Sequence, residues 1–321
     1  MFQKNILYIK KPKSYLFLFK IYTLSGIIIY MKRETLEKRT KISNDIMFYI
    51  YTHIDTDINL DTLAQELKIS KFYMHTIFKE IFGKNIYETI KSIRLQKASN
   101  LLLTNKYSTI SEIANQCGYS SQTSFIRAFK GRFSMTPKQW RKGGYKEYSQ
   151  KILTQSPHYK DITSRFENLQ PSIVKMADQE AYYIRHNGYD ESIVQTWQKL
   201  QTWTLTNNIE IYEYIALFHD NPTITPLNEC QYVASINLET TKPIRNNKLP
   251  KFKISGGVYA KFELEGNKGE LLEFIHWVYH QWLPQSDYET TTKPPFAIYK
   301  QNEYLHESNR FILSFYLPIS Y

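Results

Sequence analysis

The strongest constraint on the fold of this chain is a pattern of two short amphipathic helices joined by a tight turn, which occurs twice. In the first copy, apolar residues between Leu60 and Leu67 predict one helix, and Lys68-Ile69-Ser70 forms the turn. Ser70 is a suitable N-cap for a second helix. In that helix apolar residues recur at helical spacing, namely Met74, Ile77, Phe78 and Ile81. Two short helices on a tight turn predict a helix-turn-helix unit.

The second copy lies about fifty residues further along, in the run TISEIANQCGYSSQTSFIRAFKGRF. Ala64 corresponds to Ala114, and Phe78-Lys79 corresponds to Phe129-Lys130. Gly118 ends the first helix of this copy, as a glycine just past a helix end commonly does. Between the copies, Ile86 to Leu103 contains neither Gly nor Pro and predicts one continuous helix. That helix would hold the two units at a fixed separation.

The charge of the chain is distributed unevenly. The formal net charge is +11, of which residues 1–30 carry +5 and residues 31–150 carry +9, whereas residues 151–321 carry −3. A basic front half joined to an acidic back half favours a polyanion-binding module attached to a domain with another task. A lysine-rich solvated surface is the alternative explanation of the charge alone.

The front half resembles the AraC/XylS family of bacterial transcription regulators over about Ile42 to Tyr145. The matching runs are LAQEL, IS and FK in the first unit, IANQCGYSSQTSFIRAFK in the second, and the closing TPKQWR. The resemblance implies that each unit places its second helix in the major groove of double-stranded DNA. Neighbouring major grooves on one face of DNA are ~34 Å apart, which is a span that a rigid helix can set.

The resemblance assigns base-reading positions to Phe72, His75 and Thr76 in the first unit, and to Gln122, Thr123 and Arg127 in the second. Many relatives carry Arg where this chain has Thr76. Arg127 can donate two hydrogen bonds to a guanine. The lysines of the two second helices are expected to neutralise phosphates, with a solvated helix face as the alternative. They are Lys71, Lys79 and Lys130. RNA polymerase is a further partner that such a regulator implies.

The back half predicts an α+β domain built from two pseudo-symmetric βαββ units, after a linker at 146–169. Strands are expected at 173–185, 210–218 and 231–238 around a helix at 191–206, and again at 257–265, 296–299 and 311–318 around a helix at 269–283. With the all-α double helix-turn-helix in front, the expected domains are an extension at 1–41, a DNA-binding domain at 42–145, and a second domain at 170–321.

This second domain resembles the GyrI-like effector-binding domain, and the order of the two halves resembles the Rob-like regulators. The matching runs include HNGYDES, HDNPTITPLNECQY, SGGVYAKFELEG, HQWLPQSDYE and PFAIY. The resemblance implies an effector cleft lined by Tyr189, Trp203, Trp282, Ala297 and Tyr299.

Many relatives carry a glutamate at the position of Ala297, which attracts cations or, in a few members, serves in hydrolysis. Its absence here predicts an uncharged aromatic or amphipathic effector and no catalysis. Glu263 and Glu265 lie on a neighbouring predicted strand with both side chains on one face, and could supply a charge if that face lines the cleft. A small-molecule hydrolase fused to a DNA-binding domain, and a protein-docking module, are the alternatives.

Several other classes of protein are disfavoured. The two cysteines, Cys117 and Cys230, are far apart and belong to no CxxC motif, which disfavours a disulfide scaffold and favours a reducing cytoplasm. The histidines show no metal-ligand spacing, and no P-loop, G-x-S-x-G or dinucleotide glycine pattern is present. The sequence therefore predicts neither a metal nor a cofactor.

The first thirty residues are expected to be dispensable. They contain a short apolar run interrupted by Lys20, and Met31 follows directly as a candidate true start; a membrane anchor is the alternative. A chain that begins at Met31 should be soluble and should bind DNA as the full chain does. Recovery of the full chain in washed membranes, with the shorter chain released, would contradict this.

Overall fold

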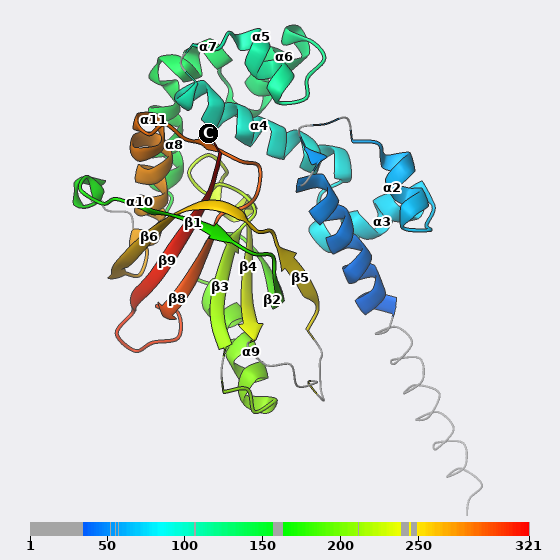
Figure 1. Cartoon of the computed structure of the whole chain (residues 1–321), viewed down its shortest axis with the longest axis vertical. Coiled ribbons are helices and arrows are strands. Elements are labelled where there is room, and N and C mark those ends of the chain that lie inside the picture. The colour runs from blue at the N-terminus through cyan, green and yellow to red at the C-terminus, as the bar shows by residue number, and fades with distance from the viewer. Residues whose placement is uncertain are drawn as a thin grey trace, which may run out of the picture.

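The computed structural model describes residues 35–51, 53–54, 56, 58–105, 107–156, 163–210, 212–238, 244 and 249–320. A helical N-terminal half lies along the top and one side of a curled antiparallel sheet (Figure 1). Within these residues, no helix is both long and apolar enough to cross a membrane. The expected extension is described only from residue 35, so Met31 and the apolar run before it lie outside the described residues.

The N-terminal half contains the two expected helix-turn-helix units, each with its own core. Residues 35–51 are helical and pack with α2 (Leu60–Glu66) and α3 (Lys71–Phe82). The second unit consists of α5 (Ile110–Gln116), α6 (Gln122–Phe133) and α7 (Pro137–Gln139). The same capping chemistry recurs in both units. Asn59 and Thr109 cap the first helices, and Ser70 and Ser121 cap the second ones.

Helix α4 (Ile86–Thr104) joins the units, as the sequence predicts. Its Arg94 donates to Thr56 O and to Gly118 O, each at 3.1 Å, so that one side chain contacts both units. Gly118 has a φ of 72°, and a Cβ at this position would lie 2.7 Å from Arg94 Cζ. Glycine is therefore required here both by the backbone angle and by the close approach of Arg94.

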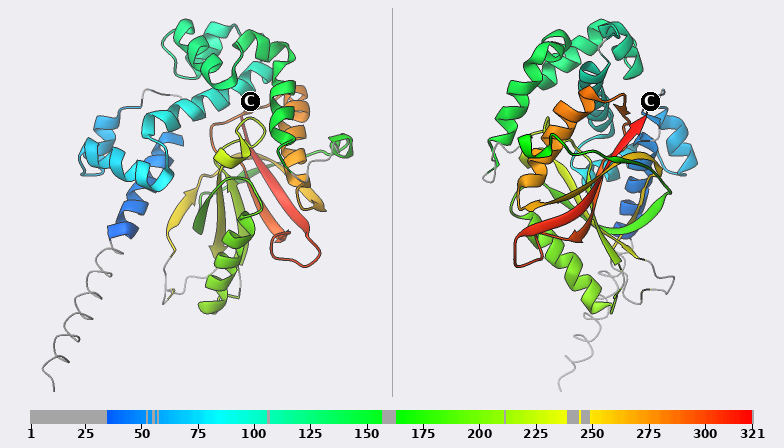
Figure 2. Two further views of the ribbon diagram at one scale, coloured as in Figure 1. Left: turned by 180° about the vertical axis from the view of Figure 1, so that it is seen from behind. Right: turned by 60° about the vertical axis from the view of Figure 1, so that its left-hand side comes forward.

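The C-terminal half contains an antiparallel sheet in the order β1-β6-β9-β8-β3-β4-β2-β5, with β7 pairing β9 outside this path. Its strands are β1 (Ser172–Met176), β2 (Gln179–Asn187), β3 (Tyr212–Phe218), β4 (Gln231–Leu238), β5 (Lys251–Ile254), β6 (Gly257–Asn267), β7 (Glu289–Thr290), β8 (Phe296–Gln301) and β9 (Arg310–Ser320). β1 and β2 follow each other in sequence but pair with strands near opposite edges, and so do β5 and β6. These two crossings curl the sheet into a half-barrel (Figure 2).

The two faces of the sheet have different partners. Helix α9 (Ile193–Thr206) and helix α10 (Glu270–Trp277) pack on the convex face against side chains such as Ala216 and Phe218. A wider helical turn at Val278–Trp282 continues α10 into α11 (Leu283–Gln285). The alternate residues Ile215 and Leu217 point to the concave face. The rim of this concave face contacts the N-terminal half.

Three details of the sheet differ from the sequence prediction. The strand expected at 173–185 is two strands, because Asp178 at the break accepts a hydrogen bond from Gly256 N where β1 passes into β2. β5 and β7 were not predicted, since they are short and are held by pairing with distant strands. Glu263 and Glu265 do share a face, but it is the concave face, whereas the expected cleft residues lie on the convex one.

The segment 219–231, between β3 and β4, attaches the sheet domain to the helical half. Gln96 on α4 donates to Asp220 Oδ1 at 3.0 Å and accepts from Asn221 N at 2.9 Å. Ile224 is 1% exposed and belongs to the hydrophobic core of the second helix-turn-helix unit. Helix α8 (Tyr145–Leu153), at the start of the expected linker, is also buried against the sheet domain through Ile152. The two halves therefore share a continuous interface.

The burial of Ile224 predicts the effect of shortening it. Ile224→Ala should lower the free energy of unfolding by about 2–5 kcal/mol, since it leaves a cavity inside the second unit. Ile173→Ala, the same change at a side chain that is 45% exposed, should change it by less than about 0.5 kcal/mol. Urea unfolding followed by the tryptophan fluorescence of the chain measures both, and equal losses would contradict the inserted position of Ile224.

Candidate functional site

The first candidate site is the outer face of α3. Phe72 is 83% exposed, and Thr76 and Lys79 are exposed beside it. His75 is partly buried and stacks on Tyr87, with ring centroids 5.4 Å apart. Burial, together with the neighbouring Lys71, lowers the pKa of His75, so the imidazole is neutral at neutral pH. This face therefore offers an aromatic ring, a hydroxyl and a neutral imidazole to a partner.

Lys71 differs from the other expected phosphate contacts. Its ammonium pairs with Asp61 at 3.0 Å, across the turn between α2 and α3. Lys79 lies a little over two turns further along the same helix and is exposed. Because the pair with Asp61 offsets part of the charge of Lys71, Lys79 is the stronger candidate for a phosphate contact in this unit.

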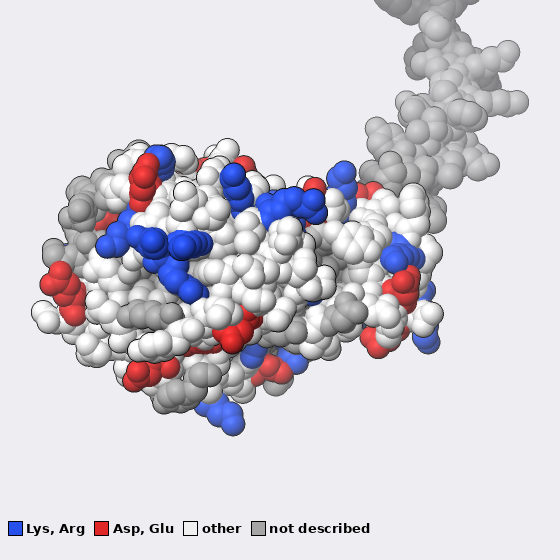
Figure 3. Space-filling view, turned by 90° about the horizontal axis from the view of Figure 1, so that it is seen from above, with Lys and Arg blue, Asp and Glu red and all other residues white. Residues whose placement is uncertain are grey.

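The second candidate site is the outer face of α6. Its inner side is fixed by Phe125, Phe129 and Phe133, which are fully buried. The outer side consists of exposed residues, namely Gln122, Thr123, Arg127 and Lys130. Seen from above the helical half, several Lys and Arg side chains lie on the surface (Figure 3). Both second helices thus leave the expected DNA-contacting side chains uncovered by the sheet domain.

A third candidate site is a cavity of about 570 Å³ beside the N-terminal ends of α9 and α10, which we call the cleft cavity. Its wall includes Tyr189, Glu191, Ser192, Lys268, Gly269 and Tyr304. Lys268, before α10, pairs with Glu191, before α9. This ion pair joins the segments that precede α9 and α10 at the cavity. The volume is within the usual range for sites that bind small organic molecules.

A buried carboxyl group lies next to the cleft cavity. Glu303, in the turn after β8, is 2% exposed, and its Oε2 has no hydrogen-bond partner in the described part of the chain. Burial raises the pKa of Glu303 to about 8, although Lys268 opposes the shift. The charge of Glu303 in turn contributes to the raised pKa values of Tyr189 and Tyr304, after their own burial. At pH 7 this carboxyl is mainly neutral.

The structure brings only one of the expected cleft residues to the cavity. Tyr189 lines it, whereas the other four belong to the convex-face core or pack against it. Trp203 packs on Tyr182, Trp282 packs on Phe262, and Tyr299 packs on Trp197. Ala297 is fully buried in β8. Trp203 and Trp282 lie on the helical layer, and Ala297 and Tyr299 lie on β8, so these four side chains pack between the helices and the sheet.

Sequence reasoning missed Glu303, Tyr304 and Lys268. The only local signal was the string QNEYL directly after the PFAIY strand, where an acid lies between an amide and an aromatic residue. An acidic residue in a turn is usually exposed, so its burial depends on contacts with distant residues. Among the described residues, no cluster of His, Cys, Asp and Glu could hold a metal ion.

Comparisons with known proteins agree with this division of the chain. Residues 169–320 match the model of the GyrI-like small molecule binding domain, and residues 63–143 match a helix-turn-helix domain. The regulatory protein SoxS of Escherichia coli K12 is 34% identical over 101 residues, which are 32% of this chain and 94% of SoxS. The chain belongs to the AraC family. It is a DNA-binding transcription regulator that carries a GyrI-like ligand-binding domain.

Other similar proteins match the same helical region of this AraC-family regulator. The transcriptional regulator Rob of Salmonella typhimurium is 35% identical over 102 residues, which are 32% of this chain and 35% of Rob. The C-terminal domain of AraT, a response regulator from Geobacillus stearothermophilus, is 31% identical with a TM-score of 0.30, and the match covers 32% of this chain and 84% of that domain.

The exposed face of α6 predicts different roles for two basic residues. Arg127→Ala should weaken binding to the specific site by ~1–3 kcal/mol and relax the preference at one base. Lys130→Ala is the control on the same face. It should weaken binding to specific and to random DNA to a similar extent, and should reduce the slope of log affinity against log salt concentration by about one. Fluorescence anisotropy at several salt concentrations measures both. Equal losses on specific and random DNA for Arg127→Ala would show that Arg127 contacts only phosphate.

Proposed function

We propose that this AraC-family regulator reads an operator with both helix-turn-helix units while its cleft cavity holds a small effector that it does not transform. The observation that carries this proposal is the combination of two uncovered second helices with a separate cavity in the GyrI-like domain. Arg127 and Gln122 would read bases in one major groove, and Phe72, His75 and Thr76 would contact bases in the next. RNA polymerase is the expected protein partner, and the cytoplasm the expected compartment.

The effector is an uncharged aromatic or amphipathic compound at neutral pH. Tyr189 and Tyr304 offer ring area on the cavity wall. Glu303 next to them has a pKa of about 8, so at pH 7 its carboxyl can donate a hydrogen bond but carries little charge. The neighbouring charges of Lys268 and Glu191 offset each other. The third charged group of the wall, Asp190, is half-exposed and accepts two hydrogen bonds from Ser192. A cation would therefore have only this solvated carboxylate to compensate its removal from water.

The hydrogen bonds around Ser192 argue against hydrolysis in the cleft cavity. Ser192 Oγ lies 3.1 Å from His186 Nε2, which resembles a nucleophile and its base. However, the hydroxyl donates its one proton to Asp190 Oδ1 at 2.5 Å, so the imidazole has no proton to accept from it. The second imidazole nitrogen faces Thr196 rather than an acid. The Ser192 hydroxyl is thus bound to Asp190 and is not an activated nucleophile.

We also propose that the GyrI-like domain is an internal repeat of two βαββ units. The strand order supports this, because β2-β4-β3 in the first half corresponds to β6-β9-β8 in the second, and β3 pairs with β8 at the centre. Helices α9 and α10 occupy corresponding places in the two halves. The cleft cavity would then lie on the line where the halves meet, which is a common place for ligands.

The raised pKa of Glu303 predicts a dependence of ligand preference on pH. Thermal shifts of the full chain would be compared for tert-butylbenzene and its charged isostere phenyltrimethylammonium. At pH 6.5 the neutral compound should give the larger thermal shift. At pH 9, where Glu303 is ionised, the thermal shift given by the ammonium compound should increase. Without ligand, the contribution of Glu303 to stability should decline as pH rises from about 4.5 to about 8, by at most ~1.4 kcal/mol per pH unit.

A matched pair of variants makes this test specific. Glu303→Gln should abolish the increase in thermal shift that the ammonium compound gives at pH 9. Glu307→Gln, at an exposed position of the same turn, should retain that increase. A larger shift with the ammonium compound already at pH 6.5 in the wild-type chain would overturn this account of the cavity.

A further inference from the structure

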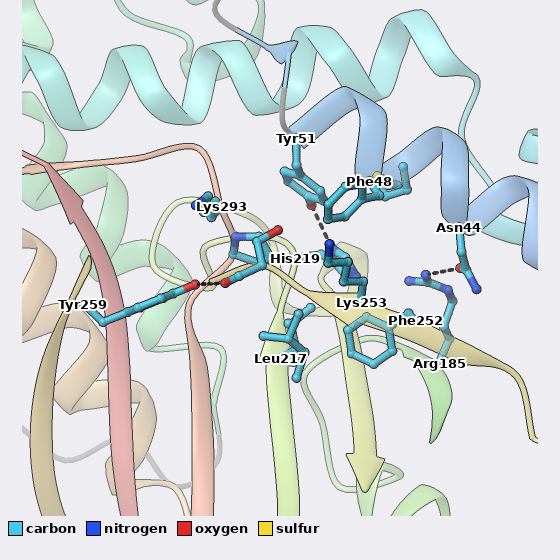
Figure 4. A pocket seen from close by; sticks show the side chains of 14 residues that line it. Asn44, Phe48, Tyr51, Arg185, Leu217, His219, Phe252, Lys253, Tyr259 and Lys293 are labelled. Atoms are coloured by element: carbon cyan, nitrogen blue, oxygen red, sulfur yellow. Dashed lines mark hydrogen bonds between the residues drawn. The ribbon is translucent and has the colours of Figure 1, made fainter. Parts of the chain in front are cut away.

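A second, smaller cavity lies between the two halves of the chain, and we call it the interdomain crevice. Residues 35–51 form one wall, through Asn44, Phe48 and Tyr51 (Figure 4). The rim of the concave sheet face forms the other wall, through Arg185, His219 and Lys293. The crevice has a volume of about 40 Å³, which is room for about three water molecules. It is separate from the cleft cavity on the convex face.

The interdomain crevice contains a half-buried arginine, with two buried nitrogens and no balancing acid. Arg185 donates through Nη2 to Asn44 Oδ1 at 2.9 Å, but its Nε and Nη1 have no hydrogen-bond partner in the described part of the chain. Its guanidinium lies 4.2 Å from the centre of the Phe82 ring. Within the described residues, no carboxylate lies within ion-pair distance of Arg185. A buried cation with unsatisfied donors is costly unless an anion completes the site.

The groups around Arg185 are also donors or cations. His219 Nδ1 lies 2.7 Å from Tyr51 Oη, and its Nε2 has no partner in the same part of the chain. Burial and the charge of Arg185 lower the pKa of His219 well below its usual value, so this ring is neutral. At the rim, Lys293 donates to Gly256 O, and Lys253 pairs with Asp178.

One acid is near but engaged elsewhere. Asp220, the residue after His219, accepts from Gln96 and from Gln231 N, each at 3.0 Å. Its third contact group is Lys84, at 4.0 Å. Asp220 thus contributes to the attachment of α4 and makes no ion pair with Arg185.

We propose that the interdomain crevice binds a small carboxylate, held by Arg185 and enclosed by both halves of the chain. At the end of the guanidinium, Nη1 and the second hydrogen of Nη2 form a parallel pair of N–H groups that matches the two oxygens of a carboxylate. The room beside it suits a carboxylate with one or two further carbon atoms, and the rings of Phe48 and Tyr51 would contact its apolar part. Because each half supplies one wall, the bound carboxylate stabilises the arrangement of the first helix-turn-helix unit on the sheet domain.

Paired small molecules test this proposal on the full chain. Acetate and propionate should raise the unfolding temperature at millimolar concentration, with ionic strength held constant by sodium chloride, and isothermal titration calorimetry should give a stoichiometry of about one. Acetamide and propionamide, which have the same shape without the charge, should have no effect. No shift with either carboxylate, an equal shift with the amides, or a shift with chloride alone would overturn the proposal.

Variants assign the effect to the crevice. Arg185→Met should weaken carboxylate binding by at least about tenfold without lowering the unfolding temperature of the ligand-free chain, since it removes an unbalanced buried charge. Arg310→Met, at an exposed position, and Glu303→Gln, beside the cleft cavity, should both leave carboxylate binding unchanged. If Arg185→Met does not fold, Phe48→Ala remains as the test, because it removes a ring that contacts the apolar part of the ligand. It should weaken the binding of propionate but leave the response to tert-butylbenzene unchanged. Carboxylate binding that persists unchanged in Arg185→Met, or propionate binding that persists unchanged in Phe48→Ala, would contradict this assignment.

Discussion

Helix α4 is the element on which the arrangement of the whole chain depends. Its Arg94 donates to backbone carbonyls of both helix-turn-helix units, so the units cannot rotate independently without losing these bonds. The same helix presents Gln96 to the 219–231 segment of the sheet domain and Asn100 to Thr290 in β7. The separation of α3 and α6 and the position of the GyrI-like domain are thus set by different faces of one helix.

The two helix-turn-helix units contact the GyrI-like domain through different kinds of interaction. The first unit is attached by polar side chains, as in the hydrogen bonds of Asn44 with Tyr183 and of Tyr51 with His219. The second unit is attached mainly by the apolar Ile224, with Arg132 donating to Thr225 beside it. A change at the sheet domain can therefore reach the two units by separate routes, one of which passes through the interdomain crevice.

The parts of this structure that the sequence predicted are those fixed by local chemistry. Ser70 and Gly118 mark helix ends through contacts with their immediate neighbours, so the double helix-turn-helix could be read directly from spacing and caps. The position of Glu303 depends instead on distant aromatic residues, and the contact of Asn44 with Tyr183 joins residues 139 positions apart. The periodicity of a sequence does not reflect contacts between distant residues, so the cavities could not be predicted from it.

Because Ile224 inserts into the second helix-turn-helix unit, the hydrophobic core of that unit extends beyond the residues that the sequence assigns to the DNA-binding domain. By sequence, the helical region corresponds to a free-standing regulator such as SoxS, nearly all of which it matches. In this structure, however, the core of the second unit includes a side chain from a segment that begins some eighty residues after that unit ends. The two halves are therefore not interchangeable parts. Exchanging the GyrI-like domain for that of a relative would also change the interior of the DNA-binding domain, so the two halves are expected to have evolved together as one packing unit.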